Sequence, residues 1–212
     1  MTKAVIFDFD GVLFDVEHKR FKDLKTVLKR YELELNDSTY SDMLGKKTIE
    51  FVRQNFPELD KKDVEKIAEE RRDLQYNELE GNKLMEGAAE LLEFLKSKDY
   101  RLVVVTGSQR FIVEELLEMH ELSKFFEVVI TGEDYRSSKP DPECYKMALE
   151  KLDLKAEEAV IIEDAAHGIT AAKRLGCRVF GLKSSFKGDE LKDADKVFNN
   201  LSEIKEFFEK EK

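Results

Sequence analysis

Two aspartates near the N-terminus, Asp8 and Asp10, have the type and spacing of chemically active carboxylates. They close an apolar run and are followed by Gly11, which allows a chain to leave a strand sharply. In a strand that continued through both residues, the two side chains would project from one face. Buried carboxylates are costly unless a cation pairs with them. An isolated Asp-x-Asp pattern also fits a solvated acidic turn, so the rest of the chain has to decide between these interpretations.

Polar groups suited to phosphate or metal also follow three later apolar runs. Hydroxyl and backbone N–H groups at the start of a helix suit an anion, a lysine offers a compact cation, and carboxylates bind hard metals. Because ligand sites in open parallel sheets form outside the carboxyl ends of the strands, these groups could converge with the two aspartates. The groups are Thr106, Gly107 and Ser108 after Leu102–Val105, Lys139 after Val128–Thr131, and Glu163 and Asp164 after Ala159–Ile162.

The acidic groups of such a site predict a divalent cation. Four carboxylates gathered at one edge of a sheet would repel one another without one. Ligands that are all oxygen atoms point to Mg²⁺, which would keep waters and a phosphate oxygen as its other ligands. The expected acidic set is Asp8, Asp10, Glu163 and Asp164.

The elements that must position these groups alternate after residue 85. Short runs rich in Val, Ile and Phe are separated by stretches in which apolar residues have helical spacing. This is the βαβ signature of a parallel sheet with both faces covered, so the sequence predicts an α/β fold with a doubly wound, Rossmann-like core. Strands are expected at Val5–Phe9, Leu102–Val105, Val128–Thr131, Ala159–Ile162, Arg178–Leu182 and Lys196–Phe198, and a last helix at Ser202–Phe208.

Residues 16–84 break this alternation. The apolar positions of two stretches fall on helical faces, a shorter helix is expected at Thr48–Asn55, and Asp60 is placed to cap the helix after it. No convincing strand interrupts these residues. We therefore expect a four-helix-like cap domain over 16–84, inserted into a core domain formed by 1–15 and 85–212.

The composition excludes several classes of protein. A net charge of −10 disfavours general nucleic-acid binding, because such a surface repels phosphate backbones. Two cysteines cannot build a disulfide framework and favour a reducing, cytoplasmic compartment. The chain starts without a signal-peptide pattern, and no apolar run approaches the roughly 18 residues of a membrane span. We expect a monomer or weak dimer without nucleic-acid or membrane partners.

Taken together, these segments resemble the haloacid dehalogenase superfamily of phosphohydrolases, in the branch whose small helical cap follows the first strand. Phosphoglycolate phosphatase and the β-phosphoglucomutase-like phosphatases belong to that branch. All four superfamily motifs have counterparts in the expected order, whereas the cap is similar only in position, length and helical character. The counterparts are residues 8–15 (Asp-Phe-Asp-Gly-Val-Leu-Phe-Asp), 103–108 (Val-Val-Val-Thr-Gly-Ser), 138–142 (Ser-Lys-Pro-Asp-Pro) and 161–169 (Ile-Ile-Glu-Asp-Ala-Ala-His-Gly-Ile).

The resemblance implies a Mg²⁺-dependent phosphatase that acts on a small phosphorylated metabolite. Asp8 would attack phosphorus and form an aspartyl-phosphate, and Asp10 would act first as general acid and then as general base. Thr106–Ser108 would hold phosphoryl oxygens, and Lys139 would offset the charge of the nucleophile and the phosphate. The implied metal ligands are Asp8, the Asp10 backbone carbonyl and Asp164, with Glu163 bound directly or through water.

Single residues bear on the choice of reaction within the superfamily. True dehalogenases need no metal and lack the second acidic residue of the first motif, which this chain has as Asp10. Shortly after that motif, sugar-phosphate mutases of the same branch tend to carry Thr and, four residues later, His. This chain has Val16 and Arg20 at those two positions. A hydrolase is therefore favoured, and a β-phosphoglucomutase-like mutase is the alternative.

The identity of the substrate stays open at this stage. Phosphoglycolate, sugar phosphates and nucleoside monophosphates all fit the same core, and the cap offers no motif that chooses among them. Three basic cap residues could meet the distal part of an anionic substrate, but we favour a solvated helix face for them. These residues are Lys46, Lys47 and Arg53.

Overall fold

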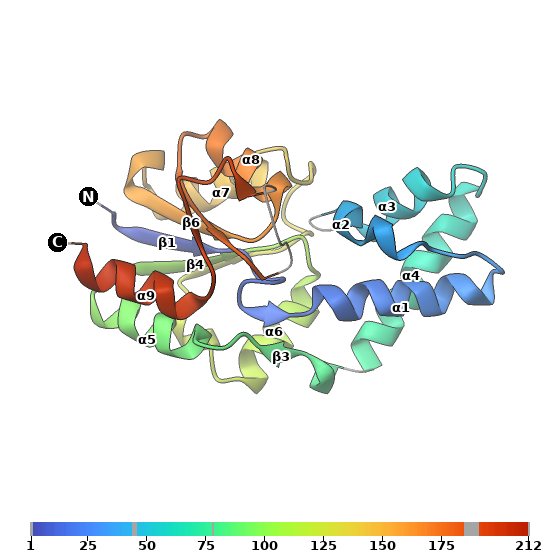
Figure 1. The fold of residues 1–212 in the computed structure, drawn as a ribbon, viewed down its shortest axis with the longest axis horizontal. Coiled ribbons are helices and arrows are strands. Elements are labelled where there is room, and N and C mark those ends of the chain that lie inside the picture. The colour runs from blue at the N-terminus through green and yellow to red at the C-terminus, as the bar shows by residue number, and fades with distance from the viewer. Residues whose placement is uncertain (1, 44–45, 78, 185–190, 212) are drawn as a thin grey trace.

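The computed structural model of the chain describes residues 2–43, 46–77, 79–184 and 191–211, and it is built around a six-stranded parallel sheet (Figure 1). The strand order is β5-β4-β1-β6-β7-β8, so that the first strand lies in the centre and its neighbours come from far along the chain. The order changes direction at β1, which creates the switch point where ligands bind in such sheets. The strands are β1 (Ala4–Phe7), β4 (Arg101–Val105), β5 (Val128–Ile130), β6 (Ala159–Glu163), β7 (Arg178–Leu182) and β8 (Lys196–Phe198).

Helices cover both faces of the sheet, which confirms the doubly wound α/β core. Alternate residues of β1 serve the two faces: Val5 and Phe7 pack with one group of helices, and Ala4 and Ile6 with the other. Because both faces are buried, the strands read as continuous apolar runs in the sequence. The first group is α5 (Ala88–Ser97), α6 (Arg110–Met119) and α9 (Leu201–Lys210), and the second is α7 (Glu143–Leu152) and α8 (Ala166–Arg174).

A second group of helices lies beside the sheet, beyond the carboxyl end of β1 (Figure 1). It has an apolar core of its own, in which Leu24, Phe51 and Ile67 are completely buried. The backbone N–H of Asp63 donates a hydrogen bond of 2.8 Å to the Asp60 carboxylate, which confirms the expected cap. None of the described helices is both long and apolar enough to cross a bilayer. The group consists of α1 (Glu17–Arg30), α2 (Tyr40–Met43), α3 (Thr48–Asn55) and α4 (Lys61–Asn77).

Two short strands connect the helical group to the sheet, and the sequence prediction missed them. The strands β2 (Phe14–Asp15) and β3 (Lys83–Leu84) pair in antiparallel register at the two crossings. Asp15 lies directly opposite Lys83, a cross-strand pair of opposite charges. A strand of two residues is too short to show an alternating apolar pattern, so only the folded chain reveals this connection.

The first strand ends two residues earlier than predicted, and this changes the directions of the two aspartates. Beyond Phe7 the chain turns: Gly11 has a φ of 84°, and the backbone N–H groups of Leu13 and Phe14 both donate to the Phe9 carbonyl. The expectation that Asp8 and Asp10 share one face of a continuing strand is therefore wrong. The carboxylates instead point to different partners in the same site.

Four short 3₁₀ helices complete the described secondary structure, and none of them belongs to the site. They are η1 (Asp37–Thr39), η2 (Leu79–Gly81), η3 (Ser123–Phe125) and η4 (Ala156–Glu158).

Candidate active site

The polar groups predicted from the strand ends do meet at one edge of the sheet. Asp8 follows β1, Thr106 follows β4, Lys139 lies beyond β5, and Glu163 is the last residue of β6. Asp8, Lys139 and Glu163 line a small cavity of about 20 Å³, to which the helical group beside the sheet also contributes residues. The lining residues are Asp8, Asp10, Arg20, Lys46, Gly107, Tyr135, Lys139, Glu163, Asp164 and Ala165.

Lys139 is the cation at the centre of this site. Its ammonium group donates hydrogen bonds of 2.6 Å to Asp8 Oδ1 and 2.7 Å to Glu163 Oε1, with all three residues buried. Burial by itself disfavours the ammonium, but the charges of Asp8 and Glu163 outweigh it and raise the pKa of Lys139 well above its ordinary value. Lys139 therefore stays protonated across the physiological range.

Asp8 lies in an environment with an excess of negative charge. Burial is the largest influence and raises the pKa of its carboxyl well above the ordinary value. Lys139 opposes this rise, and the carboxylates of Glu163, Asp10 and Asp164 add to it. A second cation beside Asp8 would oppose this rise and favour the ionised carboxylate.

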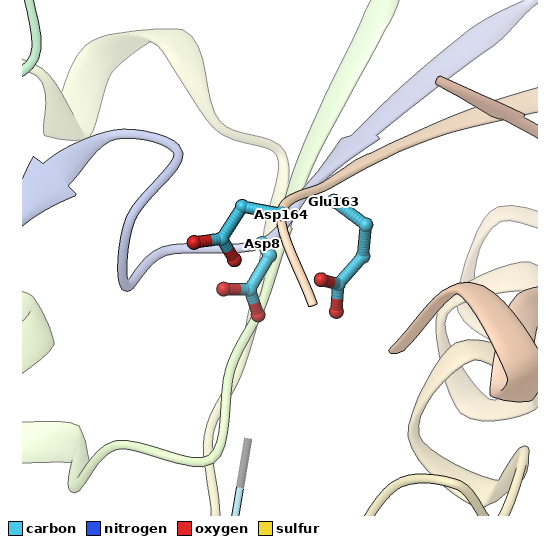
Figure 2. A group of neighbouring side chains, drawn as sticks. All are labelled: Asp8, Glu163 and Asp164. Atoms are coloured by element: carbon cyan, nitrogen blue, oxygen red, sulfur yellow. The ribbon is translucent and has the colours of Figure 1, made fainter. Parts of the chain in front are cut away.

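Asp8, Glu163 and Asp164 form a buried group that fits such a cation. One carboxylate oxygen of each lies within 4.8 Å of the others, and Figure 2 shows the side chains gathered where β1 and β6 end. Carboxylate oxygens are the donors that Mg²⁺ prefers. Asp164 also accepts a 3.1 Å hydrogen bond from Ser184, which fixes its direction. The donor set therefore fits a hard divalent metal.

The Glu163 carboxylate is already engaged by the protein on both oxygens. Oε1 accepts hydrogen bonds from Lys139 and, at 2.9 Å, from the Tyr145 hydroxyl. Oε2 accepts from the backbone N–H of Ala165, also at 2.9 Å. With 1% of its surface exposed, Glu163 is the most enclosed acidic residue of the site.

Asp10 is held through one of its two oxygens. Oδ2 accepts hydrogen bonds from the hydroxyls of Ser108 at 2.6 Å and Thr106 at 3.3 Å, and the Arg20 guanidinium lies 3.5 Å away. Oδ1 is buried and accepts no hydrogen bond from the described residues. The carboxyl is thus oriented firmly while one oxygen stays available for another molecule.

The segment after β4 both orients the Asp10 carboxylate and contacts the cavity. Thr106 Oγ1 accepts a 2.9 Å hydrogen bond from the Ser108 backbone N–H, which tightens the turn. Gly107 lines the cavity beside the acidic group. The segment after β5 approaches so closely that a Cβ on Gly132 would lie 2.4 Å from the Gly107 carbonyl oxygen. The hydroxyls of Thr106 and Ser108 are therefore turned to Asp10, while Gly107 faces the cavity.

A larger cavity of about 390 Å³ adjoins the first and extends between the sheet edge and the helices α3 and α4. The two cavities share Arg20 and Gly107. Arg71, of which 8% is exposed, contributes a buried guanidinium to the larger one. Its other lining residues are Lys47, Thr48, Ile49, Glu65, Ala68, Glu69, Arg72, Ser108, Gln109, Ile112, Gly132 and Glu133.

The helical group beside the sheet contributes cations to the site that sequence reasoning placed elsewhere. Lys46 and Lys47 were expected on a solvated helix face, but both are half-buried and line the cavities, whereas Arg53 is exposed as expected. Arg20, singled out only as a departure from a mutase pattern, reaches Asp10. Tyr145 was not singled out at all. Its position three residues after Pro142, near Lys139, was the only signal in the sequence.

Comparisons of the sequence and of the fold with known proteins agree on one family of enzymes. Residues 5–182 match the family described as haloacid dehalogenase-like hydrolases. A phosphorylated carbohydrates phosphatase from Thermotoga maritima is 32% identical over 217 residues, covering 95% of this chain and 99% of the relative. A validoxylamine A 7'-phosphate phosphatase from Streptomyces hygroscopicus subsp. limoneus is 30% identical over 206 residues, 97% of each chain. The solved structure of a β-phosphoglucomutase from Clostridium difficile superposes with a TM-score of 0.89 and is 20% identical in sequence. The match covers 100% of this chain and 96% of the mutase, and it shows a shared fold.

Proposed function

The chain belongs to the haloacid dehalogenase-like hydrolases, and from that membership we propose a Mg²⁺-dependent phosphatase that hydrolyses a small organic phosphate monoester through an aspartyl-phosphate. As a family member with phosphatase relatives, it is a phosphoric monoester hydrolase. One observation carries the finer proposal: the two aspartates are held differently. Asp8 is bound by Lys139 within the acidic group, whereas Asp10 keeps a buried oxygen that accepts no hydrogen bond from the described part of the chain.

In the first step the Asp8 carboxylate attacks phosphorus. A bond forms between the carboxylate oxygen and phosphorus, and the bond from phosphorus to the ester oxygen breaks. Asp10, protonated at this stage, gives its proton to the departing oxygen through Oδ1. Lys139 stabilises the negative charge on the phosphoryl group, and Gly107 faces the same space with its backbone.

In the second step water replaces the carboxylate. Asp10, now ionised, removes a proton from a water molecule that attacks phosphorus, and the bond to Asp8 breaks. The hydrogen bonds from Ser108 and Thr106 to Asp10 Oδ2 support this step, because they keep Oδ1 directed at the reacting atoms.

The residues that would hold Mg²⁺ are Asp8, the backbone carbonyl of Asp10 and Asp164, with Glu163 acting through a bound water. The water-mediated role is supported by the hydrogen bonds from Lys139, Tyr145 and Ala165 that already occupy Glu163. When bound, the metal would neutralise phosphoryl charge and orient the phosphate for in-line attack.

We further propose that residues 16–84 are a cap domain and that 1–15 with 85–212 form the catalytic core. The separate apolar core of the helical group and its two short connecting strands support this division. The leaving group of the substrate would occupy the 390 Å³ cavity between cap and core, which suits a small metabolite. Its mixed lining of charged, hydroxyl and amide groups suits a polar, hydroxyl-bearing leaving group.

The test is a measurement of free phosphate released from a panel of small phosphate monoesters, with Mg²⁺ and with EDTA. We expect release that needs the metal and disappears in Asp8→Asn. Asp15→Asn is the matched control, since Asp15 lies in the same segment but is exposed outside the cavities. Interconversion of sugar phosphates with little free phosphate would establish the mutase alternative instead. Release that persists in Asp8→Asn would overturn the aspartyl-phosphate.

A further inference from the structure

We infer that Tyr145 is a positioning residue for the proposed reaction: through the Glu163 carboxylate and its own ring, it holds the Lys139 ammonium against Asp8. This inference rests on the proposed function, in which Lys139 offsets phosphoryl charge. None of the family motifs from which the site was predicted contains Tyr145, which lies on the first turn of α7.

The contacts form a continuous chain from the tyrosine to the nucleophile. The Tyr145 hydroxyl donates to Glu163 Oε1 at 2.9 Å, and the same oxygen accepts from Lys139 at 2.7 Å. The Lys139 ammonium lies 4.8 Å from the centre of the Tyr145 ring and 2.6 Å from Asp8 Oδ1. Tyr145 thus contacts the Lys139 ammonium with its ring and, with its hydroxyl, holds the Glu163 carboxylate that accepts from the same ammonium.

A lysine needs such support because its side chain is long and flexible and its charge is concentrated on one small ammonium group. The four-carbon stem has many rotamers, and an ammonium can turn its donors in any direction. Hydrogen bonds to a fixed carboxylate remove that freedom before substrate arrives, so the charge is preorganised for the transferring phosphoryl group. Glu163 can serve as the fixed acceptor only if its own carboxylate cannot rotate.

Two further contacts limit the rotation of Glu163, and Tyr145 supplies the remaining restraint. The Ala165 backbone N–H holds Oε2. On the other side α8 packs so close that a Cβ on Gly168 would lie 1.6 Å from Oε1. Without the tyrosine hydroxyl, Lys139 would be the one remaining hydrogen-bond donor to Oε1 among the described residues, and the orientation of the carboxylate would be less restrained.

Packing alone does not explain a tyrosine at this position. Tyr145 is completely buried, where phenylalanine would fill nearly the same volume without a hydroxyl to desolvate. Burial, followed by the charge of Glu163, raises the pKa of Tyr145 well above its ordinary value, so the hydroxyl stays a donor throughout the working pH range. The Tyr145 hydroxyl donates its hydrogen bond to the carboxylate that holds Lys139.

The kinetic test compares Tyr145→Phe with the wild-type protein, using p-nitrophenyl phosphate and saturating Mg²⁺. Loss of a hydrogen bond to a charged group, transmitted to the transition state, should lower kcat roughly tenfold or more while KM changes less than about twofold. Tyr31→Phe is the matched control, because Tyr31 also donates to a glutamate, Glu70, at 2.7 Å but lies in the cap. An unchanged kcat in Tyr145→Phe would overturn the inference.

A second measurement separates this inference from the proposed function. The ammonium signal of Lys139 can be followed by NMR on protein labelled with ¹⁵N-lysine and assigned through Lys139→Arg. We expect a signal protected from water exchange in the wild type and broadened in Tyr145→Phe, with the Tyr31→Phe spectrum unchanged. Equal protection in wild type and Tyr145→Phe, or no protected signal in the wild type, contradicts the positioning role whether or not any ester is hydrolysed. Protection without phosphatase activity contradicts only the proposed function.

Discussion

At the scale of single residues, the chemistry depends on how the two oxygens of Asp10 differ. Ser108 donates the shortest hydrogen bond to Oδ2, at 2.6 Å, while Thr106 contributes a longer one at 3.3 Å. A carboxyl group that is pinned at one oxygen presents the other in a constant direction. For a group that has to give a proton and later take one, this orientation matters as much as the pKa does.

Ser108→Ala should therefore slow catalysis without preventing folding. Removing a hydrogen bond to a charged acceptor costs about 1.5–3 kcal/mol, which corresponds to a decrease in kcat of roughly ten- to a hundredfold. The measurement is phosphate release under saturating substrate. Ser97→Ala is a suitable control, because the Ser97 hydroxyl donates to the Phe94 carbonyl of its own helix, away from the site. A kcat within twofold of the wild type would show that Asp10 does not need Ser108.

At the scale of elements, the site depends on how closely α8 approaches the end of β6. Gly168 lies inside α8, where alanine would ordinarily favour the helix by about 1 kcal/mol. Here a Cβ would overlap the Glu163 carboxylate, 1.6 Å from Oε1 and 2.0 Å from Cδ. The absence of a side chain at Gly168 thus allows the helix to lie this close to the end of the strand.

Gly168→Ala should consequently reverse the usual sign of a glycine-to-alanine substitution in a helix. We expect a lower free energy of unfolding and a loss of most of the activity, because Glu163 or α8 must move. Urea denaturation and phosphate release would measure the two effects. Gly81→Ala provides a comparison, since its added Cβ would lie 3.7 Å from the nearest neighbour, Lys19 Cε. A stabilised, active Gly168→Ala variant is the contrary outcome.

At the scale of the whole molecule, His167 lies where charges from two parts of the fold act on one side chain. It is half-buried on α8, and the charged groups that act on it are Lys46 and Asp42 from the helical group beside the sheet and Glu163 from β6. Burial, and then the Lys46 ammonium, lower the pKa of His167 below the ordinary 6.5, while the two carboxylates oppose the decrease. The folded protein therefore binds this proton less readily than the unfolded chain does.

That difference predicts a pH dependence with a definite sign. The contribution of neutral His167 to stability is present above about pH 6.5 and is lost as the pH falls through the lowered folded value. Between pH 7.5 and 5 the wild type should lose more unfolding free energy than His167→Gln, as measured by urea denaturation in EDTA. His18→Gln is the control, because His18 is exposed. Equal losses in wild type and His167→Gln would contradict the prediction.

Metal binding should also stabilise the whole molecule, because the acidic group exists only in the folded state. At a free Mg²⁺ concentration of 100 times Kd, linkage adds about 2.7 kcal/mol, a rise in Tm of roughly 5–10 °C for a chain of this length. Thermal denaturation with and without Mg²⁺ measures the shift. Asp164→Asn should reduce it, and an equal shift in that variant would place the metal elsewhere.

Much of the core could be predicted because its signals are local. The strands Arg178–Leu182 and Lys196–Phe198 and the helix Thr48–Asn55 have the predicted bounds, since apolar periodicity and turn residues specify them within a short window. Elements without such a signal were missed. The two-residue strands β2 and β3 have no period to detect, and the turn after Phe7 depends on pairing between Gly11 and Phe14.

The sequence by itself determined the fold class and the polar groups at the strand ends, because parallel strands buried on both faces leave a continuous apolar pattern and bring their carboxyl ends to one edge. Only the tertiary structure decided how those groups are engaged. It turned Ser108 to Asp10, brought Arg20 and Lys46 from the helical group beside the sheet to the site, and placed the Tyr145 ring beside the Lys139 ammonium. Ser108 and Asp10 are 98 positions apart in the chain, and the contacts of Arg20 and Tyr145 depend on which face of a helix meets the site. No local pattern in the sequence records either.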